Sequence, residues 1–356
     1  MVNTAVQRLH NQQLVQTILQ TPAEVVGWLG AAQAQEYQHA KWALGMRLPH
    51  GITDSAVEQA FNDGSILRTH VMRPTWHFVT PADIRWILEL TAPRVNMLNE
   101  YMYRQLELDE AIFQRSNAAI IQALEGDKHL TRVELGKVLK QVGIVAEGMR
   151  LGYIVHRSEL DAIICSGPRR GKQFTYALIA ERAPHARILQ RDEALVELVK
   201  RYFTSHGPAT IKDFARWSGL TVADGKVGLE MAKPDMVEEV IEGKSYWYAA
   251  SMPVRTEPVP AAYLLPPYDE YTIGYKDHDE ILDPQYLEKI RNNIFGGVIM
   301  INSQIIGAWR RTFSKGTVII ETDLFRSLTD AENEAFATVL EQYGEFLEMP
   351  VIVAKN

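Results

Sequence analysis

Residues 192–250 read DEALVELVKRYFTSHGPATIKDFARWSGLTVADGKVGLEMAKPDMVEEVIEGKSYWYAA, and this stretch decides the fold. Apolar residues between Leu195 and Phe203 recur at helical spacing and form one stripe, which predicts an amphipathic helix. Gly207-Pro208 ends that helix, and Gly219 separates a short second helix from a third. Glu242-Gly243-Lys244 then joins two strand-like segments as a hairpin turn. Three helices followed by a β-hairpin are typical of a winged helix-turn-helix unit.

The same order of elements recurs twice upstream, although no exact sequence repeat is visible. The second copy has a six-residue basic tip, Gly167–Lys172, between two apolar strands, as expected of a wing that contacts DNA. The first copy turns at Met72-Arg73-Pro74. The first copy should span residues 22–80 and end in strands over 66–70 and 75–79. The second should contain helices over 112–124, 131–142 and 148–160, followed by strands over 162–166 and 173–178.

After about Thr256 the pattern changes to a strand meander with covering helices. We therefore predict an α+β fold of three tandem winged helix-turn-helix units followed by a small C-terminal β-rich, barrel-like domain. The last domain should contain a helix over 284–292, strands over 298–301, 305–311 and 317–322, a helix over 330–346 and a strand over 351–354. The expected domains are 1–106, with the N-terminal and connecting helices, 107–187, 188–255 and 256–356. Short connections near 106–110, 180–187 and 254–260 predict rigid docking of the units.

Composition excludes several classes of protein. The 356 residues are 46% hydrophobic and 23% charged, which is the globular range. No apolar run approaches the roughly 18 residues of a membrane span. The N-terminal residues MVNTAVQRLHNQQ lack the apolar segment of a secretory signal, so we expect a cytoplasmic protein in contact with the nucleoid. A single cysteine, Cys165, excludes internal disulfides and thiolate zinc clusters.

The charge pattern leaves room for a local basic face. A net charge of −7 argues against a protein that coats nucleic acid through bulk charge. Two segments nevertheless contain three cations and no acid. They hold Arg169, Arg170 and Lys172 in one case, and Arg310, Arg311 and Lys315 in the other.

The motifs of several enzyme classes are absent from the sequence. HExxH, CxxC, GxGxxG, GxSxG and a Walker loop do not occur. His70 and His77 flank a predicted wing, but the ten histidines show no metal-ligand spacing. We therefore expect neither a zinc or serine hydrolase nor a bound metal or cofactor.

Gln33-Ala34-Gln35 lies between two apolar helical segments. Two glutamines at this spacing are common, so composition alone favours a solvated helix face, and a functional motif is the alternative. On a regular helix, positions i and i+2 lie about 200° apart and cannot line one pocket. If both side chains serve one site, the helix is interrupted, and we predict a break near Ala32–Tyr37.

Other polar residues allow two interpretations each. The basic tip of the second unit could be a solvated turn or a phosphate-binding loop. Lys212 and Arg216 beside Trp217 are compatible with structural support, because a winged helix usually sends its third helix to DNA. In Trp309-Arg310-Arg311, strand alternation places Arg310 opposite the other two, and either face could belong to the core. For Asp269-Glu270-Tyr271 we favour a salt bridge to one of these arginines.

These residues resemble the AlkZ-like family of tandem winged-helix DNA glycosylases over nearly the whole chain. The matching blocks are Gln33–Gln35 with Lys41–Leu48, Arg73–Val79, Ile164–Tyr176, Arg201–Thr210, Leu265–Tyr271 and Gly307–Arg311. The resemblance implies a C-shaped protein of three winged helices and a C-terminal β-domain, with a concave basic surface for double-stranded DNA. Family members excise bulky N-alkylated purines, including those in interstrand crosslinks.

The resemblance also implies roles for individual residues. A glutamine–aliphatic–glutamine motif is the catalytic signature of the family, and it maps onto Gln33 and Gln35. A related branch has aspartate at the second position, so Gln35 places this chain with the crosslink-specialised branch. Together with the basic segments, the matching blocks give these candidates for DNA contact: Arg73, His77, Arg169, Arg170, Lys172, Gln173, Lys212, Arg216, Trp309, Arg310 and Arg311.

The chemistry of glutamine fits a restricted reaction. Cleavage of an N-glycosidic bond passes through an oxocarbenium-like sugar. A glutamine amide is a poor base, but it can hold a water and stabilise developing charge. An N7- or N3-alkylpurine is already cationic and leaves without an acid. The motif offers no lysine, so we predict a monofunctional glycosylase. We also expect a monomer. The alternative is a winged-helix DNA-binding protein or transcription regulator without catalysis.

Overall fold

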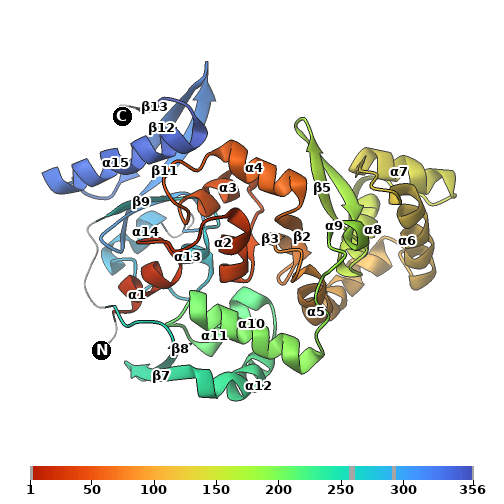
Figure 1. Ribbon diagram of the computed structural model, residues 1–356, viewed down its shortest axis with the longest axis horizontal. Coiled ribbons are helices and arrows are strands. Elements are labelled where there is room, and N and C mark those ends of the chain that lie inside the picture. Colours follow the sequence, from red (N-terminus) through yellow and green to blue (C-terminus); the bar gives the residue numbers. More distant parts are fainter. Residues whose placement is uncertain (1–2, 256–260, 291–293, 355–356) are drawn as a thin grey trace.

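The computed structural model describes residues 3–255, 261–290 and 294–354, and its fold is a mixture of helices and sheets, as predicted (Figure 1). Three successive segments contain three helices and then a hairpin. We call these segments the first, second and third units. The first unit comprises α2 (Pro22–Leu29), β1 (Ala32–Gln33), α3 (Tyr37–Gly45), α4 (Asp54–Asp63), β2 (Leu67–Val71) and β3 (Thr75–Val79). The second comprises α6 (Glu110–Leu124), β4 (Leu130–Thr131), α7 (Arg132–Gln141), α8 (Gly148–Leu160), β5 (Ile164–Arg170) and β6 (Gln173–Leu178). The third comprises α10 (Arg191–Ser205), α11 (Ile211–Ser218), α12 (Val222–Ala232), β7 (Met236–Ile241) and β8 (Lys244–Ala249).

All three units share one pairing detail. A short extended segment after the first helix pairs antiparallel with the second strand of the hairpin. This segment is β1 against β3 in the first unit and β4 against β6 in the second. In the third unit it is a single bridge between Ala209 and Trp247. This pairing joins backbone groups and does not require particular side chains, so it can recur without a repeat in the sequence.

Threonine followed three residues later by an acid starts several of these helices. The Thr131 hydroxyl accepts a hydrogen bond from the backbone N–H of Glu134, and the Glu134 carboxylate in turn accepts one from the Thr131 N–H at 2.7 Å. Thr210 with Asp213 and Thr221 with Asp224 form the same reciprocal cap in the third unit. Such caps satisfy N–H groups that the first helical turn leaves without partners. The local sequence therefore determines where these helices begin.

The C-terminal part is built on one curved sheet. Its strand order is β13-β12-β11-β10-β9, so the pairing of the described strands leaves the sheet open rather than closed as a barrel. The predicted helix over 284–292 is a short 3-10 turn followed by α14, and residues 291–292 lie outside the described part. The elements are β9 (Ala262–Leu265), α13 (Glu270–Ile273), α14 (Leu287–Ile290), β10 (Val298–Ile301), β11 (Gln304–Ser314), β12 (Thr317–Leu324), α15 (Asp330–Leu347) and β13 (Val351–Val353).

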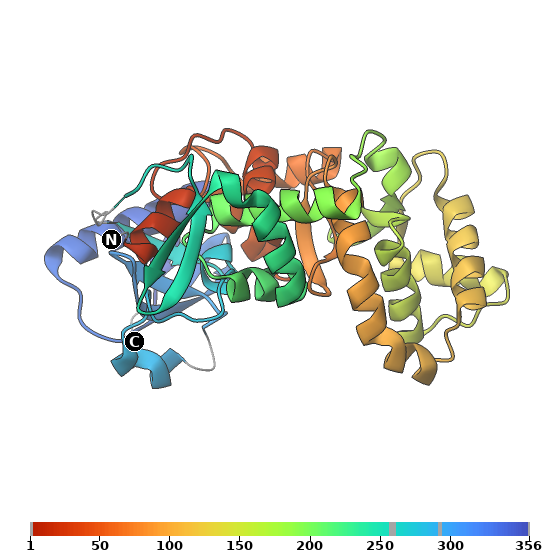
Figure 2. The same cartoon turned by 90° about the horizontal axis from the view of Figure 1, so that it is seen from below.

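Three further helices flank the units: α1 (Thr4–Asn11) precedes the first unit, and α5 (Ile84–Gln105) and α9 (Ile179–Arg182) connect successive units. Figure 2 shows α5 between the first unit and the second, which forms one end of the molecule. The connection expected at 180–187 begins inside α9. There Arg182 donates to the carbonyls of Phe61 and Asn62 at 2.9 and 3.0 Å, at the end of α4. The connection expected at 254–260 lies mostly outside the described residues.

The first unit and the C-terminal sheet share one hydrophobic core. Trp42 of α3 lies against Tyr343 and Phe346 of α15, with ring centroids 4.9 and 5.1 Å apart. Trp309 of β11 is only 2% exposed in the same core, and its indole N–H donates to the Leu265 carbonyl at 2.9 Å. This shared core agrees with rigid docking of the two parts. Among the described helices, none has the length and apolarity needed to cross a membrane.

The tip of the β5–β6 hairpin is shorter than predicted. The expected six-residue loop is wrong, because β5 continues to Arg170 and pairs there with Gln173. The register of the two strands shifts between Gly167 and Arg170, and beyond this irregularity the strands pair again. The Thr175 hydroxyl donates to the Pro168 carbonyl at 2.6 Å within it. Only Gly171 and Lys172 remain in the turn. Figure 1 shows this hairpin and the β11–β12 hairpin projecting at the upper edge, on either side of α4.

Candidate functional site

The two glutamines lie at the interruption predicted between helices. α2 ends at Gly30, whose φ of 85° is in the left-handed region, and α3 begins at Tyr37. A Cβ at Gly30 would lie 3.5 Å from the ring of Trp217, so this turn rests on the third unit. Between the helices, Gln33 belongs to β1 and Gln35 follows it. Gln35 lies in a bend and not in a helix, so the separation of about 200° that a continuous helix would impose does not apply.

Both glutamine side chains bond to the β2–β3 hairpin. Arg73 donates from a guanidinium nitrogen to Gln33 Oε1 at 3.1 Å. The Trp76 backbone N–H donates to Gln35 Oε1 at a longer 3.4 Å. Ala34 between them is fixed by hydrogen bonds to the Trp76 carbonyl and from Arg68, at 2.7 and 3.1 Å. Gln33 is 8% exposed, whereas Gln35 is exposed, so the second amide is the more accessible one.

A buried carboxylate, Glu270, lies directly behind Gln33. Its Oε1 accepts the backbone N–H of Gln33 at 2.7 Å, and its Oε2 accepts the indole N–H of Trp217 at 2.9 Å. His206 Nε2 lies 3.4 Å from the same Oε2. Glu270 is 3% exposed and belongs to α13 of the C-terminal part. The first unit, the third unit and the C-terminal part therefore meet at this single side chain.

The protonation of this cluster follows from its contacts. Burial alone would raise the pKa of Glu270, but the hydrogen bond from His206 and the Gln33 N–H outweigh it and lower the pKa to about 2. Burial lowers the pKa of Arg73, and the charge of Glu270 opposes that shift. Burial and the charge of Arg73 lower the pKa of His77 to about 4. At neutral pH the site holds an ionised Glu270 and a neutral His77.

His77 is part of the site but has no exposed surface. It pairs with Gln33 across β1 and β3, and its Nδ1 lies 2.9 Å from the Thr75 carbonyl. That contact places the proton on Nδ1 and leaves Nε2 as a buried acceptor without a hydrogen-bond partner in the structure. A side chain that is 0% exposed has no surface to offer DNA in this conformation.

The candidate DNA-contacting residues divide by exposure. Arg73 is partly buried against Gln33, and Arg311 is partly buried with its guanidinium near Tyr343. Arg169 turns back onto the first unit, where it pairs with Glu58 at 3.5 Å and its side chain is 12% exposed. Trp309 belongs to the core, so strand alternation leaves Arg310 as the solvent-facing member of that motif. The exposed candidates are Arg170, Lys172, Gln173, Lys212, Arg216 and Arg310.

Sequence reasoning missed Glu270 and misassigned Asp269. The expected salt bridge from this acidic pair to one of the candidate arginines is wrong. Asp269 instead binds Arg47 with two contacts, at 2.8 and 2.9 Å. Glu270 turns to Gln33, His206 and Trp217. The only sequence signal was the position of two acids in an otherwise apolar segment after Pro266-Pro267, where buried carboxylates need partners.

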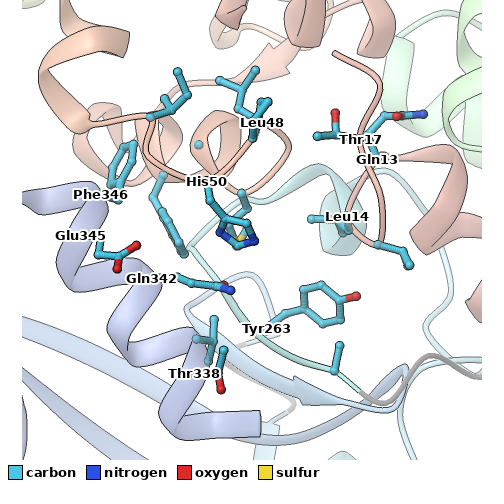
Figure 3. A pocket seen from close by; sticks show the side chains of 18 of the residues that line it. Gln13, Leu14, Thr17, Leu48, His50, Tyr263, Thr338, Gln342, Glu345 and Phe346 are labelled. Carbon is cyan, nitrogen blue, oxygen red and sulfur yellow. The ribbon is translucent and has the colours of Figure 1, made fainter. Parts of the chain in front are cut away.

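A pocket lies apart from the glutamines. It has a volume of about 500 Å³ and opens between the segment 13–17, the α3–α4 connection and α15. Figure 3 shows His50 near its centre, with Gln342 and Tyr263 alongside. The Tyr263 hydroxyl is buried without a partner in the structure. Neither Gln33 nor Gln35 lines this pocket. Among the described residues, no group of three His, Cys, Asp or Glu side chains is placed to hold a metal ion.

Comparison with known proteins identifies the class. A family model described as DNA glycosylase AlkZ-like matches residues 26–346. The protein is therefore a DNA glycosylase by family, an enzyme class that hydrolyses N-glycosyl bonds during DNA repair. The chain belongs to the AlkZ-like family, which confirms the resemblance noted in the sequence.

A curated protein and a solved structure from Streptomyces sahachiroi are also similar to this chain. A protein described as interstrand DNA cross-link repair glycosylase is 26% identical over 319 residues, and the match covers 85% of each chain. The solved structure of the DNA glycosylase AlkZ superposes with a TM-score of 0.81 at 22% identity, over 99% of this chain and 98% of that one. At this identity the structural likeness establishes a shared fold.

Proposed function

We propose that this protein removes cationic N-alkylated purines from double-stranded DNA, including purines joined in interstrand crosslinks. The observation that carries the proposal is the placement of Gln33 and Gln35 at one edge of β3, with their Oε1 atoms turned to the β2–β3 hairpin. The relative described as a cross-link repair glycosylase supports the substrate class. The N7- or N3-alkylpurine leaves as a neutral base, so the site needs no acid.

The two amides have different roles in this proposal. Because Arg73 binds Gln33 Oε1, the amide plane of Gln33 is fixed and its NH₂ group is the free donor. Gln35 is exposed, and its longer contact to Trp76 leaves its carbonyl free to accept from a water. Together they hold the attacking water against the sugar carbon, with the Gln33 NH₂ donating to the water and the Gln35 carbonyl accepting from it. The negative end of the Gln35 amide dipole also stabilises the oxocarbenium-like transition state. Neither residue can form a Schiff base, so the strand is not cut.

DNA binding is assigned to three winged-helix units. The recurrence of three helices, a hairpin and a short pairing segment supports this assignment over residues 1–106, 107–187 and 188–255, with the C-terminal domain over 256–356. A bulky crosslink does not fit a snug pocket, which favours an open concave surface over base flipping. We propose that the enzyme acts as a monomer on nucleoid DNA.

The exposed cations of the second hairpin should contact phosphates. We expect Arg170→Ala with Lys172→Ala to weaken binding equally on all duplex sequences. The slope of log K against log salt concentration should become shallower by about 0.9 for each phosphate contact that is lost. Arg191→Ala is a matched control, because both arginines are exposed and ion-paired, Arg170 with Glu134 and Arg191 with Asp224. Fluorescence anisotropy at several salt concentrations measures the slope. A slope equal to that of the control variant would remove this hairpin from the interface.

An excision assay tests the proposed function against DNA binding without catalysis. A duplex with one N7-methylguanine, an N7-linked crosslink and an undamaged duplex are incubated with the enzyme, with and without alkali. The proposal predicts strand breaks that require both the lesion and alkali, independent of flanking sequence. Preference for one duplex sequence with no lesion-dependent product would favour a regulator that has the motif without the chemistry.

A further inference from the structure

We infer that Glu270 is a positioning residue for excision, a role that rests on the proposed function of Gln33. Glu270 belongs to α13, 237 residues from Gln33 along the chain, and its carboxylate accepts the Gln33 backbone N–H at 2.7 Å. The partner strand β3 lies on the other side of β1. Glu270 therefore fixes the edge of the motif that the sheet leaves free.

The second oxygen of Glu270 ties the motif to the third unit. Oε2 accepts the indole N–H of Trp217 at 2.9 Å and lies 3.4 Å from His206 Nε2. Trp217 and His206 are both 0% exposed, and their rings are 5.3 Å apart. The aromatic pair leaves the carboxylate little freedom to move. Since Trp217 also supports Gly30 at the end of α2, the third unit holds the Gln33 segment at two points.

The charge of Glu270 has a second consequence for the motif. The guanidinium that binds Gln33 Oε1 would repel a sugar that becomes cationic in the transition state. The charge of Glu270 favours the charged form of Arg73, so the carboxylate offsets part of the positive charge that the guanidinium would place near the sugar. Arg73 also donates to the Arg216 carbonyl at 3.0 Å, which fixes the guanidinium between the β2–β3 hairpin and the third unit. In this inference the carboxylate therefore maintains the position of Gln33 and supplies a negative charge that opposes that of Arg73.

The chain contains a close structural match for this cluster outside the site. Asp83 is a buried carboxylate that accepts the indole N–H of Trp86 at 2.9 Å and pairs with Arg201. Both Trp86 and Trp217 are 0% exposed and belong to the same hydrophobic core. Substitutions at Asp83 and Trp86 therefore reproduce the loss of packing and hydrogen bonding while leaving the hydrogen bonds of Gln33, Gln35 and Glu270 in place.

The test compares Glu270→Gln and Trp217→Phe with Asp83→Asn and Trp86→Phe in single-turnover excision of N7-methylguanine. We expect Glu270→Gln to slow excision about tenfold or more and Trp217→Phe about threefold, with duplex Kd within about twofold of the wild type. The control variants should lose thermal stability to a similar degree but retain the wild-type rate. Circular dichroism at the assay temperature confirms that each variant is folded.

A double-variant measurement separates positioning from a general structural effect. In the Gln33→Ala background, Glu270→Gln should slow the residual rate by less than about twofold, because Glu270 acts through Gln33. Equal slowing by the site and control variants would overturn the inference, as would full additivity with Gln33→Ala. If Gln33→Ala leaves no measurable rate, the comparison of Trp217→Phe with Trp86→Phe alone decides between positioning and a general structural effect. Absence of excision by the wild type would instead overturn the proposed function.

Discussion

Gln35→Ala is expected to slow base excision by about 100-fold while leaving duplex affinity within about twofold of the wild type. The exposed amide of Gln35 holds the water in our proposal, and removal of one preorganised group of this kind costs about 10²–10³ in rate. Gln33→Ala should have a similar effect on rate. It should also lower stability slightly, because Gln33 is 8% exposed and bonded to Arg73.

Single-turnover kinetics on an N7-methylguanine duplex measures this effect, with binding followed separately by anisotropy. Gln38→Ala is a suitable control, because Gln38 is an exposed glutamine on α3 only three residues from Gln35. Its rate should equal that of the wild type. A parallel loss of rate and affinity in the Gln35 variant would mean that the motif has a binding or structural role instead.

Asp269→Ala is expected to lower the free energy of unfolding by about 3–5 kcal/mol, because it leaves a buried guanidinium without its counter-ion. Arg47 is 1% exposed and Asp269 is 0% exposed. Arg47 also donates to the carbonyls of Ala43 and Gln12, so its head cannot turn to solvent without breaking these bonds. The pair joins α3, the N-terminal segment and the residues before α13. Its loss should therefore loosen the same junction that holds Glu270.

Urea unfolding followed by tryptophan fluorescence measures the free energy. Arg310→Ala is the matched control, because its ion pair with Glu321 is exposed on both sides and should contribute little. A change for Asp269→Ala no larger than for Arg310→Ala would show that the buried pair does not hold the junction together.

Local signals in the sequence predicted most of the helices and strands. Thr210 and Thr221 mark the starts of α11 and α12, and their acidic partners three residues later form the caps. The break at Ala32–Tyr37 followed from helix geometry together with the premise that both glutamines serve one site, because residues at i and i+2 cannot share one helical face. The order of the elements and the interruption of the helix at the motif both depend on neighbouring residues, so they could be predicted from one sequence.

The contacts that surround the motif could not be predicted in the same way. Strand alternation separates Trp309 from Arg310 but does not say which face meets the core, and α15 decides it. Arg169 lies in a basic segment, yet Glu58 and the rings of Tyr37 and Phe174 draw it onto the first unit. Glu270 reaches Gln33 only because three parts of the chain fold together. Such long-range pairings leave no local pattern.

The most direct test of the central claim is mass spectrometry of what the enzyme releases from a duplex with one N7-methylguanine. The account predicts free N7-methylguanine and an intact strand with an abasic site for the wild type. It predicts roughly a hundredth of that rate for Gln35→Ala and the full rate for Gln38→Ala. Release of the base by Gln35→Ala at the wild-type rate would contradict the assignment of the motif. No free base from the wild type, despite duplex binding, would contradict the proposed function.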